Sequence, residues 1–169
     1  ENIIYDDIEE IDYGFDFYAP QTMIDDQGRR IMVAWMQSWN RTPLTSRLGF
    51  AGMMTLPREL TLINNILYQT PVQEIENYRT NEVIETVTLN QQTYENEQIF
   101  GHSQELILSI EPGTGKSGVK LFVGDNEETL VYYEDGYVYL DRTKSTQSRI
   151  SASVIHNITR APAELIDGK

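Results

Sequence analysis

Short apolar runs separated by turn-forming clusters recur along the whole chain, and this pattern predicts a fold built from β-strands. The first pair of runs, residues 15–19 and 31–36, flanks the turn-forming residues 25–28 and predicts an antiparallel hairpin. The second pair, residues 60–63 and 66–69, flanks two asparagines, which tolerate the positive φ angles of a two-residue hairpin turn. We therefore expect two hairpins in the front half of the chain.

The rear half continues the pattern, with predicted strands at residues 82–89, 105–110, 119–123, 129–133 and 137–140. Short strands separated by polar turns at this spacing are typical of a sandwich or a barrel. In the last predicted hairpin, one half-buried face is expected to carry Val131, Tyr133, Tyr137 and Tyr139. Only residues 72–78 have the pattern of a helical turn, and they lie where a linker between two parts would sit.

The composition excludes several classes of partner and site. The 169 residues carry a formal net charge of −13, which repels phosphate backbones and anionic lipid, so we expect no nucleic acid and no membrane partner. The chain has no cysteine, which excludes disulfides, thiolate metal sites and a cysteine nucleophile. Its two histidines are far apart, which disfavours a Ser-His-Asp triad or a histidine-rich metal site. We therefore expect neither a metal nor a cofactor.

Residues 113–117, with the sequence GTGKS, resemble the end of a phosphate-binding P-loop. The complete motif needs a glycine five residues before Gly115, where this chain has Ile110. It also needs a helix afterwards, where residues 118–122 have the pattern of a strand. We interpret these residues as a flexible hairpin loop.

Residues 12–22, with the sequence DYGFDFYAPQT, place two carboxylates among aromatic rings. On an extended strand Asp12 and Asp16 would lie about 13 Å apart at ~3.3 Å per residue. That separation is too large for a pair acting on one glycosidic bond, which needs about 5 to 9.5 Å. A carboxylate beside a ring can accept hydrogen bonds from sugar hydroxyls while the ring covers the apolar sugar face. The alternative is an aspartate that ties down a glycine turn next to an aromatic strand.

The two tryptophans raise the same question. Trp35 and Trp39 are four residues apart, so on a strand both side chains would point one way. We expect Trp35 to pack in the core. Trp39 lies at the predicted strand end, either as a stacking platform for a sugar ring or as a half-exposed packing residue.

Three stretches closely resemble glycoside hydrolase family 32: DYGFDFYAPQT (residues 12–22), GRRIMVAWMQSW (28–39) and GMMTLPREL (52–60). One departure is Phe50, where the family pattern has tryptophan. The resemblance implies an all-β fold, with the last strands of a five-bladed β-propeller followed by an incomplete β-sandwich. It divides the chain into the end of the propeller catalytic domain (1–70), a linker (71–80) and a truncated C-terminal sandwich (81–169).

The resemblance also implies retaining cleavage of terminal fructosyl bonds in sucrose, sucrose 6-phosphate or fructans. The family's catalysts are an aspartate nucleophile and a glutamate acid/base, in motifs of the Asn-Asp-Pro, Arg-Asp-Pro and Glu-Cys types. None of these motifs occurs in the sequence, so the resemblance implies no catalytic residue here, a chain inactive alone, and catalytic motifs encoded upstream. It implies four substrate-binding candidates: Asp12, Asp16, Tyr18 and Trp39.

Some predictions concern the setting of the chain. The expected partner of the complete enzyme is a fructosyl-containing sugar, and we expect exposed sheet edges to favour pairing with another copy. The sequence of residues 15–21, FDFYAPQ, resembles that of bacterial intracellular members of the family, which predicts a cytoplasmic location. The alternative function is a non-catalytic β-sandwich module for glycan binding or oligomerisation.

Overall fold

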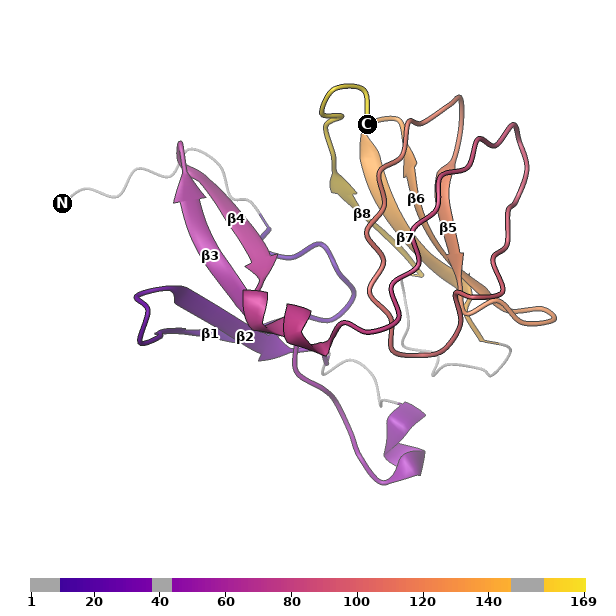
Figure 1. The fold of residues 1–169 in the computed structure, drawn as a ribbon. Helices are drawn as coiled ribbons and strands as arrows, with labels where there is room; N and C mark the ends of the chain where they lie inside the picture. The colour runs from indigo at the N-terminus through magenta and orange to yellow at the C-terminus, as the bar shows by residue number, and fades with distance from the viewer. Residues whose placement is uncertain (1–9, 38–43, 147–156) are drawn as a thin grey trace.

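The computed structural model describes residues 10–37, 44–146 and 157–169, and these form two four-stranded antiparallel sheets (Figure 1). The front sheet has the order β1 (Tyr18–Ile24), β2 (Arg30–Trp35), β3 (Arg58–Ile63) and β4 (Ile66–Pro71). The rear sheet has the order β5 (Ser117–Leu121), β6 (Glu128–Glu134), β7 (Tyr137–Lys144) and β8 (Ile158–Pro162). Two 3₁₀ helices accompany them, η1 (Leu44–Leu48) and η2 (Gln73–Tyr78). The all-β prediction is confirmed.

Both predicted front hairpins are present. Strands β1 and β2 pair antiparallel across the turn at residues 25–29, and β3 pairs with β4 in register. The β3–β4 turn consists of Asn64 and Asn65, whose φ angles of 51° and 65° are the left-handed conformations that this turn requires. Strand β1 begins at Tyr18 rather than at residue 15, because the chain bends at residues 14–15.

The front sheet is organised around strand β2. Ile31, Met32 and Ala34 are buried, with Met32 only 1% exposed. Just before β3 begins, the chain runs beside the end of β2, where the Ala34 amide donates to Thr55 Oγ1 (3.1 Å) and the Thr55 amide donates to the Ala34 carbonyl (2.9 Å). The prediction that Trp35 packs in the core is wrong, since its side chain is 43% exposed. Successive strand side chains point to opposite faces, so the buried Ala34 turns Trp35 outward.

The rear hairpin differs from the prediction in its register. Tyr132 pairs directly with Tyr139, because the β6–β7 turn holds two residues. Directly paired residues share a sheet face, and the two rings stack at 4.9 Å between centroids. Tyr137 and Tyr139 therefore lie on the face of Tyr132, and the predicted common face with Val131 and Tyr133 is wrong.

Two predicted strands, residues 82–89 and 105–110, are not strands in the structure. A strand is defined by ladder hydrogen bonds to a neighbour, and neither segment pairs with one. Their apolar side chains remain outside a core, as Ile84 at 83% and Ile107 at 79% exposure show. Conversely, β8 was not predicted, because its sequence ITRAP contains no run of large apolar residues and ends in a proline that only an edge strand accepts.

The helical turn predicted at residues 72–78 is η2, which lies between the two sheets (Figure 1). Arg29 attaches η2 to the front sheet, since its Nη2 lies 2.7 Å from Glu74 Oε1 and its Nε lies 2.7 Å from Asp25 Oδ2. The hydrogen bond from Arg29 lowers the pKa of Glu74. On the other side, Arg79 forms an ion pair with Glu105. Within the described residues, no helix has the length and apolar character needed to cross a membrane.

Candidate functional site

Asp12 is held by groups of the chain itself. Its Oδ1 accepts a hydrogen bond from the Gly14 amide (2.7 Å), and its Oδ2 lies 2.7 Å from Arg58 Nη1. The Asp12 side chain is only 14% exposed. This is the glycine-turn arrangement that the sequence offered as the alternative to a sugar contact, with an added ion pair. The assignment of Asp12 to substrate binding stays a prediction.

Arg58, at the start of β3, organises the surroundings of Asp12. Besides the ion pair, its Nη1 donates to Gln69 Oε1 (3.0 Å), and its guanidinium carbon lies 5.1 Å from the centre of the Phe17 ring. Gln69, on β4, in turn donates through Nε2 to the Ile11 carbonyl (2.6 Å). Two adjacent strands of the front sheet therefore fix the segment of residues 11–17 on one side.

The rear sheet contacts the same segment on the other side. The Arg142 guanidinium carbon lies 3.6 Å from the centre of the Phe15 ring. Thr159 Oγ1, on β8, donates a hydrogen bond to the Tyr13 carbonyl. Residues 11–17, which we call the bridging segment, therefore touch both sheets.

The remaining site candidates are partly brought together. Asp16 is half-buried within the bridging segment, and Tyr18 follows at the start of β1 with 47% exposure. The Tyr18 ring lies 6.3 Å from that of Trp35, its partner in the β1–β2 ladder. This exposed aromatic pair presents ring surface, and Asp16 lies two residues before Tyr18 in the sequence. A ring together with a carboxylate is the combination that a sugar contact needs. Trp39 lies outside the described residues.

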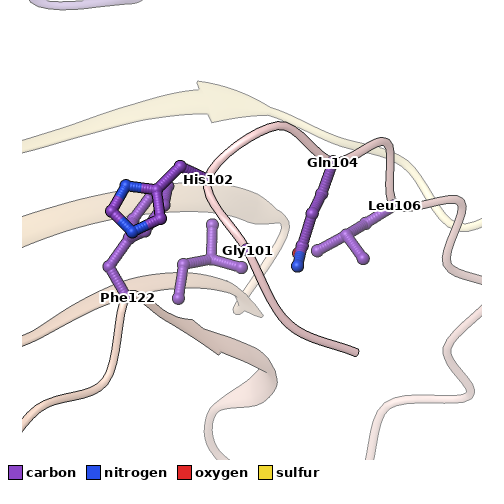
Figure 2. A pocket seen from close by; sticks show the side chains of 6 residues that line it. Gly101, His102, Gln104, Leu106 and Phe122 are labelled. Carbon is purple, nitrogen blue, oxygen red and sulfur yellow. The ribbon is translucent and has the colours of Figure 1, made fainter. Parts of the chain in front are cut away.

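A small open hollow occurs in the rear half, remote from these candidates in the chain. Figure 2 shows His102 beside Phe122, with Gln104 and Leu106 also lining the hollow. The two rings meet edge to face at 6.2 Å. The lining contains no carboxylate, so the hollow lacks the acid and base groups of a glycosidase site. Among residues 10–37, 44–146 and 157–169, no group of three or more His, Asp or Glu side chains could hold a metal ion.

Residues 113–117 can be interpreted from their surroundings. Strand β5 begins at Ser117, where a P-loop requires the start of a helix. The Gly113 amide donates to Ser117 Oγ (3.3 Å), which closes the loop on itself. The interpretation as a loop of a β-structure, rather than a phosphate cradle, is supported.

Comparison with known proteins identifies the chain's relatives. A family model described as the N-terminal domain of glycosyl hydrolases family 32 matches residues 2–71. A sucrose-6-phosphate hydrolase of Zymomonas mobilis is 38% identical over 146 residues, an overlap that covers 83% of this chain and 28% of that enzyme. The chain belongs to glycoside hydrolase family 32.

Two further proteins are similar to the chain, one in sequence over its front part and one in fold over most of its length. A raffinose invertase of Escherichia coli is 49% identical over 71 residues, which is 42% of this chain and 15% of the invertase. The structure of a sucrose-6-phosphate hydrolase from Lactobacillus gasseri matches with a TM-score of 0.62 at 20% identity, over 91% of this chain and 31% of that chain. The latter likeness is one of fold. The chain thus spans less than a third of the length of these glycosidases.

Sequence reasoning missed the residues of this family 32 chain that hold the candidate site in place. Arg58 was recognised as part of a motif, yet nothing local indicates that it pairs with Asp12, 46 residues away. Arg142 and Thr159 contact residues still further away along the chain.

Proposed function

We propose that this chain is the rear part of a β-fructofuranosidase that cleaves the terminal fructosyl bond of sucrose or sucrose 6-phosphate. The observation that carries the proposal is the 38% identity to a sucrose-6-phosphate hydrolase over 83% of the chain. In this proposal the chain contributes the end of a five-bladed propeller, most of a sandwich, and one wall of the sugar pocket.

The poor burial of apolar side chains supports a role as part of a larger enzyme. Among the described residues, only four hydrophobic side chains are buried: Ile31, Met32, Ala34 and Tyr132. The β3–β4 hairpin exposes Leu62, Ile63 and Ile66, each at 50% or more. Exposed apolar surface of this kind marks a face that another part of the protein covers. Neighbouring propeller blades would cover this hairpin.

The chemistry of the complete enzyme would be retaining hydrolysis. An aspartate attacks the anomeric carbon of the fructosyl unit while a glutamic acid protonates the departing oxygen, and water then releases fructose from the covalent intermediate. We place both catalysts outside these 169 residues, because the family's three catalytic motifs are absent from the sequence.

This chain would contribute to sugar binding through Asp16, which is half-buried at the end of the bridging segment, and through the exposed Tyr18 that follows it. Asp16 would accept hydrogen bonds from sugar hydroxyls, and Tyr18 would provide ring surface. Asp12 would act mainly through Arg58, since both its carboxylate oxygens already have partners within the chain. We also propose a cytoplasmic location, which fractionation of the producing cells tests.

Fructose release tests the proposal. The purified 169-residue chain is expected to release no fructose from sucrose, sucrose 6-phosphate or inulin, whereas the product of the full coding sequence hydrolyses at least one of them. In the latter protein, Asp16→Asn is expected to raise KM on the order of tenfold through lost charge-assisted hydrogen bonds. Turnover by the chain alone would place the catalysts within it, and an inert full-length product would refute the enzymatic function.

A further inference from the structure

Two arginines, one from each sheet, contact the two phenylalanine rings of the bridging segment. Arg58 of the front sheet lies over Phe17, at 5.1 Å, and Arg142 of the rear sheet lies over Phe15, at 3.6 Å. Asp16 is the residue between the two rings. A guanidinium over a ring is attracted to the negative ring face, and the attraction strengthens where water is excluded. Arg142, Phe15 and Phe17 are all half-buried.

The rear contacts come from the two adjacent strands β7 and β8. Thr159 on β8 pairs with Leu140 on β7, and Arg142 follows two residues later in β7, where the ladder with β6 shifts its register. Thr159 donates to the Tyr13 carbonyl and Arg142 covers Phe15. The two contacts therefore lie on either side of the Gly14 bend, so the rear sheet holds the bridging segment both before and after it.

We propose that Arg142 is a positioning residue: from the rear sheet it holds Phe15, and thereby fixes Asp16 and Tyr18 in the orientation from which they contact a fructosyl sugar. The sugar contact rests on the proposed function. The contact of Arg142 with Phe15, which we call the clamp, rests on the structure alone. The consequence is that the rear sheet, although it has no catalytic group, sets the geometry of a pocket wall that belongs to the front sheet.

Arg160 provides a matched control. It lies on β8 next to Thr159, points to the opposite side of the sheet, and covers Tyr137 at 4.1 Å. Its hydrogen bond to Tyr139 Oη, at 3.2 Å, also stays within the rear sheet. Removing Arg160 therefore deletes a cation–ring contact of the same kind without touching the bridging segment.

Hydrogen–deuterium exchange of the product of the full coding sequence, measured without any sugar, tests whether Arg142 restrains the bridging segment. In Arg142→Gln, peptides covering residues 12–18 should exchange on the order of tenfold faster, since the contact that restrains them is lost. Arg142→Lys, which keeps a cation over the ring, should restore part of the protection. Arg160→Gln should leave these peptides unchanged, and peptides of β6 should be unchanged in all three variants.

Two results would overturn the proposal: wild-type exchange of residues 12–18 in Arg142→Gln, or equal acceleration in Arg160→Gln, which would indicate general loosening of the rear sheet. If Arg142→Gln does not fold, Phe15→Leu removes the ring and keeps the arginine. It should accelerate the same peptides, and unchanged exchange in Phe15→Leu would equally overturn the clamp. Because exchange is measured without sugar, its outcome is separate from that of the fructose-release assay.

Discussion

Each carboxylate oxygen of Asp12 has a partner within the chain, the Gly14 amide on one and Arg58 on the other. A carboxylate with this environment contributes to structure first, because a buried charge that loses its partner is costly. The local half of the arrangement, an aspartate tying down a glycine turn, followed from the two-residue spacing in the sequence. The ion pair between Asp12 and Arg58 could not be predicted, because the two residues are 46 positions apart and no local pattern links them.

Substituting Asp12 measures this structural role. Asp12→Asn keeps an oxygen for the Gly14 amide and removes the charge that faces Arg58. The expected loss in the free energy of unfolding is about 1.5–3 kcal/mol, the range for a hydrogen bond to a charged group. Urea denaturation of the chain measures it, with Asp26→Asn in the exposed β1–β2 turn as the control. Equal stability of Asp12→Asn and wild type would contradict the role of the ion pair.

At the scale of elements, local patterns predicted strands well where a neighbour was adjacent in sequence. Strands β3 and β4 are joined by an Asn-Asn turn that specifies both the hairpin and its register. Residues 82–89 have an equally apolar pattern and form no ladder. Composition measures the tendency to be a strand, whereas a ladder also requires a second strand in the right place.

Close packing between β5 and β6 depends on Gly118. A Cβ at this position would lie 2.1 Å from the Val131 carbonyl oxygen and 2.5 Å from Tyr132 Cα, both backbone atoms that cannot move aside. Gly118→Ala is therefore expected to lower the free energy of unfolding by about 1–3 kcal/mol. Near-ultraviolet circular dichroism during thermal unfolding reports the loss. Gly113→Ala, with no atom within 4 Å of the added Cβ, is the control, and equal melting of the two variants would be inconsistent with the clash.

The attachment of η2 to the front sheet should depend on pH. The hydrogen bond from Arg29 lowers the pKa of Glu74 below the usual 4.5. A carboxylate with a lowered folded-state pKa adds stability above its unfolded pKa, and this stability is lost as pH falls through the folded pKa. Glu74→Gln should therefore melt below wild type at pH 7, with a difference that shrinks as the pH falls below 4.5. A difference that stays constant down to pH 3 would exclude Glu74 as the titrating group.

For the whole molecule, the pattern of apolar runs predicted the all-β class. The family resemblance predicted the division into a propeller end, a linker and a sandwich. Nothing in composition indicates how the two sheets meet, because the contacts at Phe15 and Tyr13 join residues more than a hundred positions apart. Trp35 illustrates the same limit, since its exposure depends on which face of β2 the neighbouring chain covers.

Self-association is a prediction at this scale. Strands β1, β4, β5 and β8 are the outer strands of their sheets, and outer strands carry unpaired backbone groups that can pair with another copy. The net charge of −13 opposes such pairing at low ionic strength. Light scattering coupled to gel filtration should therefore show a rise in mass between low and high salt. A constant monomer mass across that range would rule out pairing through the sheet edges.

The bridging segment also constrains the order of events during synthesis. The Tyr13 carbonyl accepts a hydrogen bond from Thr159, which is translated 146 residues later. The β1–β2 and β3–β4 hairpins close over short distances and can form on the growing chain, whereas the bridging segment completes its contacts only once Thr159 has been translated. Until residue 142 is translated, the segment is held by the front sheet alone, through Arg58 and Gln69, so termination before that point would leave Phe15 and the Tyr13 carbonyl without their partners in the rear sheet.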